Sequence, residues 1–99
     1  MPRNTSVAAI VAGLLALGFA VDANAAVGYV ALSAKGKPEK GYLNPKPGCH
    51  PALGAGTTVT NGTDRVLRLF PDGNCLTRID NPLKPGQGRT GDFGSFQVL

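Results

Sequence analysis

Two cysteines and one histidine are the residues of this chain whose types could do the most specific chemistry. Cys49 and Cys75 are its only cysteines, and His50 is its only histidine. A nucleophile needs a base within reach and a third group that orients the base, and no spacing of Ser, His and Asp here supplies them. We therefore predict no catalytic residues and place His50 in an exposed loop. A minor enzymatic activity through His50 is the alternative.

The sequence also does not predict a metal site, a bound cofactor or a nucleic-acid partner. A zinc site needs Cys, His or carboxylate ligands in a group of three or four, and oxidised cysteines leave only His50 and scattered carboxylates. Most of the aspartates stand at turns, where Asp bonds to nearby backbone. The chain has no Trp and only six other aromatic residues, two Tyr and four Phe, too few for a base-stacking surface.

The first 25 residues are typical of a secretory signal peptide. Arg3 precedes an apolar run over 7–21, and the run ends near Ala23-Asn24-Ala25, an A-x-A cleavage signal. The run spans about 15 residues, fewer than the roughly 20 that a helix needs to cross a bilayer. We therefore expect a helical signal peptide over 1–25, a secreted domain over 26–99 and no stable membrane span.

Export determines how the two cysteines are interpreted. In an oxidising compartment Cys49 and Cys75 are expected to form a disulfide. Closing a loop of about 26 residues stabilises a fold by roughly 3 to 4 kcal/mol on the chain-entropy estimate. This is a large share of the stability of about 5 kcal/mol expected for so small a domain. An intermolecular disulfide or two free thiols are the alternatives.

The lysines are the candidate binding residues. The chain has a net charge of +4, and four lysines fall close together among Gly and Pro: Lys35, Lys37, Lys40 and Lys46. Such a basic loop favours an acidic partner, either an extracellular protein or an anionic cell-envelope polymer. The alternative is a solvated, mobile loop whose charge only keeps the protein soluble.

Short β-type runs separated by Gly and Pro predict an all-β fold. The expected strands cover 27–32, 57–60, 65–70, 75–79 and 93–99. Between them we expect a long loop over 33–53, with a short strand hidden near Tyr42, and turns at 71–74 and 81–91. Asn61-Gly62 predicts a type I′ hairpin turn, although Asn61-Gly62-Thr63 also fits the N-glycosylation pattern. Together the runs predict a small Greek-key β-sandwich of five or six short strands.

Several motifs from residue 48 onward carry a resemblance. They are Gly48-Cys49-His50, Val59-Thr60-Asn61-Gly62-Thr63-Asp64, Leu69-Phe70 leading to Cys75, and Lys84-Pro85-Gly86 followed by Ser95-Phe96-Gln97-Val98. This half of the chain resembles small exported actinobacterial proteins with a βγ-crystallin-like Greek key. The resemblance implies that Phe70 is the first aromatic of the crystallin motif and that Ser95 pins a folded hairpin. Cys75 and Thr77 depart from the motif, standing where a second aromatic and a Gly belong.

The resemblance also implies functions. Members of that group bind calcium, and some relatives inhibit proteases or act as antimicrobial proteins. The calcium signature matches this chain only at Asp92 and Ser95, which leaves a hard cation short of oxygen ligands. We therefore predict no calcium site.

The leading hypothesis is a secreted, non-enzymatic binding module that uses the basic loop. A disulfide-stapled scaffold suits binding because loops held in place lose less entropy when a partner docks. A protease inhibitor presenting Lys35 or Lys40 is one form of this hypothesis. The alternative is an antimicrobial or toxin-like basic protein that acts on anionic cell envelopes, with Tyr29 and the apolar first strand in contact with the membrane. A purely structural envelope role is also open.

Overall fold

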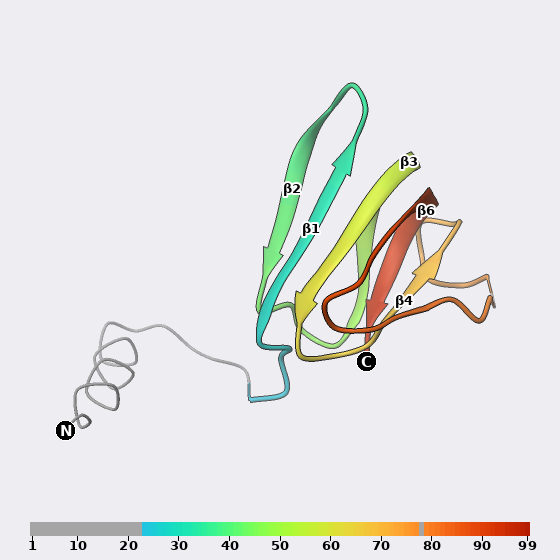
Figure 1. The fold of residues 1–99 in the computed structure, drawn as a ribbon. Coiled ribbons are helices and arrows are strands. Elements are labelled where there is room, and N and C mark those ends of the chain that lie inside the picture. The colour runs from blue at the N-terminus through green and yellow to red at the C-terminus, as the bar shows by residue number, and fades with distance from the viewer. Residues whose placement is uncertain (1–22, 78) are drawn as a thin grey trace.

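The computed structural model describes residues 23–77 and 79–99, so the predicted signal peptide lies outside the described residues except for its last three. Six strands form one antiparallel sheet in the order β2-β1-β3-β6-β4-β5 (Figure 1). They are β1 (Gly28–Ala34), β2 (Lys37–Leu43), β3 (Gly48–Thr63), β4 (Leu67–Phe70), β5 (Pro82–Leu83) and β6 (Gly88–Val98). The predicted all-β class is confirmed, whereas the Greek-key arrangement stays a prediction. In the part of the chain that the structure describes, no helix is long and apolar enough to span a bilayer.

The long loop expected over 33–53 is wrong, because most of this segment forms β2 and the start of β3. The short strand expected near Tyr42 is confirmed, and it is longer than expected because β2 begins at Lys37. Tyr42 of β2 pairs with Val30 of β1, and Lys40 pairs with Leu32. Local propensity concealed the strand, since Lys, Pro, Glu and Gly are all depleted in sheets. An edge position tolerates them, because charged residues and proline at an edge discourage pairing with other chains.

Strand β3 runs straight through the position where a hairpin turn was expected. Asn61 and Gly62 lie near its end and pair with Val30 and Tyr29 of β1, so the predicted turn is wrong. The strand bends earlier, at Gly54 and Gly56, whose φ angles of 90° and 70° suit glycine. Its pairing register with β6 shifts at the same place. Such bends carry a sheet round a corner.

The bend brings β2 and β6 together over one core. The Tyr42 ring of β2 lies 5.2 Å from the Phe96 ring of β6, although β1 and β3 separate these two strands in the sheet. The apolar side chains of both halves therefore pack against each other rather than against a second sheet. The buried residues of this core are Ala26, Val30, Leu32, Val59, Leu67, Leu69, Leu83, Phe93, Phe96 and Val98.

The remaining differences lie near the C-terminal end. The expected strand over 75–79 is wrong, because none of its described residues is extended in the sheet. Strand β4 begins two residues later than expected, and β6 begins five residues earlier. The connection expected over 81–91 contains β5, which pairs with β4 at Leu67 and Arg68. The described residues of the segment 71–81 thus form a loop beside the sheet.

Candidate functional site

The four candidate lysines lie along a β-hairpin rather than in a loop. Lys35 stands at the turn between β1 and β2, where Gly36 has a φ of 78°. Lys37 and Lys40 belong to β2, and Lys46 follows the strand in the connection to β3. All residues from Lys35 to Gly41 are exposed, and Figure 1 shows the tip of this hairpin extending beyond the rest of the sheet.

Two of these lysines contact their own chain. The Nζ of Lys37 donates a hydrogen bond to the carbonyl oxygen of Leu53 at 2.6 Å, which ties β2 to the bend in β3. The Nζ of Lys40 lies 5.4 Å from the centre of the Tyr42 ring, within the range of a cation–π contact. The side chains of Lys35 and Lys46 make no hydrogen bond or ion pair with the described residues. Of the four candidate lysines, Lys35 and Lys46 are therefore the two most available to a partner.

His50 is part of the sheet, and the prediction that it lies in an exposed loop is wrong. It lies in β3 and is partly buried, with its ring stacked on Phe96 at 5.3 Å between centroids. Its Nε2 is 2.7 Å from the carbonyl oxygen of Lys46. This bond holds the connection that carries Lys46. The neighbouring Tyr42 hydroxyl donates to the carbonyl oxygen of Pro51 at 2.9 Å, so the same ring cluster also fixes the base of the hairpin.

The predicted disulfide is confirmed between Cys49 at the start of β3 and Cys75 in the loop over 71–81. Ser95 of β6 holds the same loop. Its Oγ donates to the carbonyl oxygen of Asp72 at 2.6 Å and accepts from the backbone N–H of Cys75 at 3.0 Å. Gly94 permits this close approach, because a Cβ there would lie 2.8 Å from backbone atoms of Asp72. Ser95 thus pins the turn that follows Phe70.

The Asp72 carboxylate holds the same turn through hydrogen bonds to its backbone. Its carboxylate accepts hydrogen bonds from the backbone N–H groups of Thr77 at 2.9 Å, Leu76 at 3.0 Å and Asn74 at 2.8 Å. These bonds, led by those from Thr77 and Leu76, hold the pKa of Asp72 well below its usual range. The carboxylate is therefore committed to the loop and is not free to act as a general base.

The lowered pKa of Asp72 predicts acid sensitivity. Because this pKa lies below that of the unfolded chain, Asp72 stabilises the fold above about pH 4, and this stabilisation is lost as the pH falls further. We expect Asp72→Ala to lower the urea midpoint at pH 7. Between about pH 4 and pH 2 the midpoint of the variant should fall less steeply with pH than that of the parent chain. Far-UV circular dichroism during urea titration measures both effects. Asp80→Ala is the control, since the Asp80 side chain makes no hydrogen bond or ion pair with the described residues; equal acid slopes for both variants would contradict the assignment.

A groove that the sequence did not predict lies between this loop and the sheet. It has a volume of about 490 Å³. Its lining combines a cation, a carboxylate, an amide and apolar groups: Arg68, Asp80, Gln97, Phe70, Cys75, Leu76 and Ile79. The side chains of Arg68 and Asp80 have no partner among residues 23–77 and 79–99. The groove forms because the described residues of 75–79 lie outside the sheet. A strand over 75–79, as predicted from the sequence, would have left no groove there.

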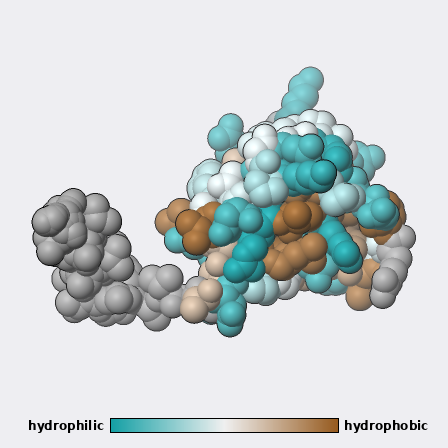
Figure 2. Space-filling model, turned by 60° about the horizontal axis from the view of Figure 1, so that its bottom comes forward, coloured by the Kyte–Doolittle hydropathy of each residue, from teal (hydrophilic) through white to brown (hydrophobic). Residues whose placement is uncertain are grey.

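A small apolar patch lies at the base of the hairpin. Tyr29 of β1 pairs directly with Leu43 of β2, and both are exposed, Leu43 at 73%. Val27, two residues before Tyr29, is also exposed. The Tyr29 ring lies over Gly41, where a Cβ would be only 2.1 Å from the tyrosine oxygen. Figure 2 shows patches of hydrophobic side chains among hydrophilic ones on the face turned toward the viewer.

Within the described residues, no three His, Cys, Asp or Glu side chains gather in a way that could hold a metal ion. Comparison with known proteins gives no assignment: no family model, no curated protein and no solved structure matches the chain.

Proposed function

We propose that this chain is a secreted, non-enzymatic binding module whose β1–β2 hairpin contacts an anionic polymer of the cell envelope. The observation that carries the proposal is the series of exposed lysines that runs from Lys35, just before β2, to Lys46, just after it, with β2 at the edge of the sheet. A strand rises about 3.4 Å per residue, so β2 spans about 20 Å from Lys37 to Leu43, with Lys35 before it and Lys46 after it. A row of positive charge of that length suits a linear polyanion.

The hairpin geometry favours a polymer over a protease as the partner. An inhibitor of this kind must offer an extended segment to the protease, as peptides do when they are bound as an added strand. Lys35 instead stands in a tight turn beside Gly36, and Lys40 is paired with Leu32 across the β1–β2 ladder. The inhibitor form of the hypothesis therefore has less support than polymer binding.

The disulfide fits the proposed location. Disulfides persist in oxidising compartments and are common in small secreted domains that cannot build a large core. The bond between Cys49 and Cys75 joins the start of β3 to the loop over 71–81, and His50 beside Cys49 anchors the connection that bears Lys46. The staple therefore keeps one end of the basic row in a fixed position.

Charge reversal on the hairpin should abolish most of the binding. Each lysine near an anionic surface contributes about 1 kcal/mol, so Lys35→Glu/Lys46→Glu is expected to weaken binding by at least about 30-fold. We chose Lys35 and Lys46 because their side chains have no partner among the described residues, which leaves the fold intact. Poly(glycerol phosphate) is the probe, and its dissociation constant is measured by isothermal titration calorimetry at low and at moderate salt.

A matched control separates local contact from net charge. Lys84 is exposed in the turn between β5 and β6, so Lys84→Glu changes the net charge as much as Lys35→Glu does. We expect Lys84→Glu to leave the affinity within about twofold, because Lys84 follows β5, at the opposite edge of the sheet from β2, and salt screens interactions between distant exposed charges. Equal losses for the two single variants, or no binding by the parent chain, would refute the hairpin proposal. Stoichiometric inhibition of any protease in a panel would favour the inhibitor form instead.

The apolar patch at the base of the hairpin favours contact with an anionic membrane as the second candidate function. Tyr29 and Leu43 are exposed side by side, and Lys46 follows three residues after Leu43. Apolar side chains flanked by cations are typical of proteins that lie on a membrane surface. Vesicles with and without anionic lipid test this candidate, and Leu43→Ser should weaken vesicle binding without affecting the polymer.

A further inference from the structure

The residues around the predicted cleavage site are built into the fold. Ala25 and Ala26 are 8% and 1% exposed, and Ala26 belongs to the apolar core. The backbone N–H of Ala26 donates to the carbonyl oxygen of Pro45 at 2.9 Å. The bond between Ala25 and Ala26, where the A-x-A signal predicts cleavage, is therefore covered on both sides.

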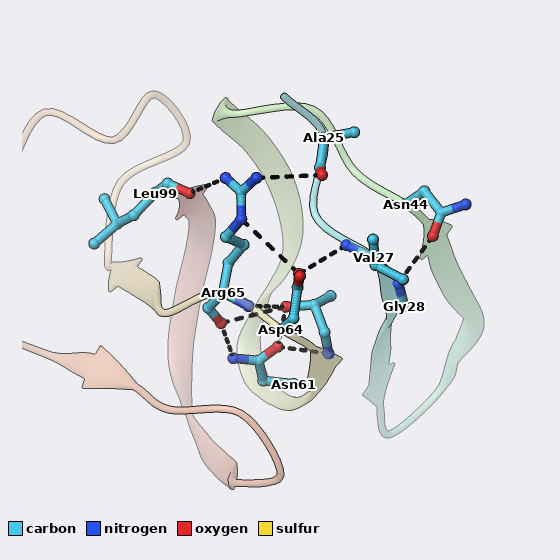
Figure 3. A network of polar contacts seen from close by, with 9 residues as sticks. Ala25, Val27, Gly28, Asn44, Asn61, Asp64, Arg65 and Leu99 are labelled. Carbon is cyan, nitrogen blue, oxygen red and sulfur yellow. Dashed lines mark hydrogen bonds and ion pairs between the residues drawn. The ribbon is translucent and has the colours of Figure 1, made fainter. Parts of the chain in front are cut away.

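Asp64 and Arg65 clamp this segment from the turn that follows β3. The Asp64 carboxylate accepts from the backbone N–H of Val27 at 2.8 Å, and the Asp64 N–H donates to the Val27 carbonyl at 3.0 Å. The Arg65 guanidinium donates to the carbonyl oxygens of Ala25 at 3.4 Å and of Leu99 at 3.0 Å. Figure 3 shows Arg65 reaching between these two carbonyls, with Asp64 beside Val27.

We propose that the bond between Ala25 and Ala26 is a processing site that folding closes. Cleavage takes place while the chain is unfolded, and Ala26 then becomes the first residue of the mature domain. This inference rests on the secretion part of the proposed function and is independent of the hairpin's partner. It assigns Asp64 and Arg65 a role in processing that the strand pattern does not reveal.

The closure follows from what a signal peptidase must do. The small side chains of the A-x-A signal identify the cleavage position, and the enzyme has to reach them and the bond that follows. In the folded chain Ala25 is buried, and 23–24 form a turn rather than an extended segment. Cutting the folded chain therefore requires local opening, and its rate scales with the fraction of molecules that are open.

The contacts are also placed so that the mature domain loses little on cleavage. The bonds of Ala26 with Pro45 and of Val27 with Asp64 all lie on the mature side of the cut. Of the contacts described above, only the one from Arg65 to the Ala25 carbonyl is removed. The segment from Ala26 can dock in the same place with or without the residues that precede it.

The test compares cleavage of three forms of the full 99-residue chain by a purified signal peptidase in the same detergent buffer. The forms are the oxidised chain, the clamp variant Asp64→Ala/Arg65→Ala, and the unfolded chain made by Cys49→Ser/Cys75→Ser in moderate urea. The oxidised chain in the same urea is the control for effects on the enzyme. Intact mass gives both the rate and the site, and circular dichroism reports folding.

We expect the unfolded chain to be cut at Ala25–Ala26 at least about tenfold faster than the oxidised chain, with the clamp variant between them while it remains folded. Equal rates for the oxidised and unfolded chains would overturn the proposed closure, whereas the prediction of a signal peptide would still stand. If the unfolded chain is not cut at this bond, the secretion premise fails, and the inference fails with it. If a folded clamp variant resists as strongly as the parent, the roles assigned to Asp64 and Arg65 are wrong.

Discussion

The double variant Cys49→Ala/Cys75→Ala is expected to lose about 3 to 4 kcal/mol of the free energy of unfolding. The expected loss comes mainly from the unfolded chain, which gains conformational freedom when a loop spanning a sequence separation of 26 is no longer closed. A domain of this size has about 5 kcal/mol in total. We therefore expect the variant to be partly unfolded at 37 °C.

The folded state contributes a smaller part of this loss. Cys75 lies in the loop over 71–81 with a positive φ of 56°, and its N–H is bonded to Ser95. Ser95 and Asp72 can hold the loop in place when the disulfide is absent, so the native arrangement is expected to survive at low temperature. The free energy is best measured by urea unfolding at 10 °C and 25 °C, followed by circular dichroism.

Leu76→Ala is the matched control for the disulfide variant, because Leu76 follows Cys75 in the same loop and is 75% exposed. A surface substitution of this kind changes stability by no more than about 0.5 kcal/mol. A loss below about 1 kcal/mol for the double variant would show that the unfolded chain is already compact near these residues. Treatment of the parent chain with reductant should reproduce the variant's midpoint.

The strands that the sequence predicted correctly are those with a clear local signal. The β-branched run over 57–60 lies in β3, and the apolar run over 27–32 overlaps β1. The disulfide could also be predicted, because the chain holds only two cysteines. In each case the residues themselves predict the structure, and no knowledge of their neighbours in space is needed.

The features that the sequence did not predict depend on distant contacts. Strand β2 forms because β1 offers it a partner, and its own residues favour other structures. The groove depends on the loop over 71–81 leaving the sheet, which Asp72 and Ser95 bring about through backbone hydrogen bonds. The candidate lysines were predicted to lie in a loop, and only the hairpin shows that Lys37 and Lys40 contact their own chain.

Asn61 is the clearest case of a residue whose local signal was misleading. It is fully buried, and its Nδ2 donates to the carbonyl oxygens of Arg65 at 2.8 Å and Leu83 at 2.9 Å. Its Oδ1 accepts from the N–H and the hydroxyl of Thr63 at 3.0 Å and 2.6 Å. The folded chain therefore leaves no room for a glycan on this amide, although the sequence motif would accept one.

Asn61→Ala is expected to cost about 3 kcal/mol or more, because it leaves several buried backbone groups without their partner. Asn74→Ala is the matched control, since Asn74 is exposed and an alanine there keeps the backbone bond to Asp72. Urea unfolding of both variants gives the comparison. A cost for Asn61→Ala below about 1 kcal/mol would mean that water replaces the amide, and that the end of β3 is more open than its burial indicates.

Asn61→Asp sharpens this prediction, because it replaces only the donating NH₂ group. An ionised carboxylate cannot donate to the Leu83 carbonyl, and its burial at this site raises the pKa of the new aspartate. A raised pKa in the folded state means that the variant regains stability as the pH falls and loses it as the pH rises. Relative to the parent chain, Asn61→Asp should therefore be less stable at pH 7 than at pH 4.5. If the difference in stability between variant and parent does not change with pH, the two hydrogen bonds donated by the Asn61 amide contribute little to stability. The bonds that Asn61 Oδ1 accepts from Thr63 would then be what holds Asn61 in its buried position.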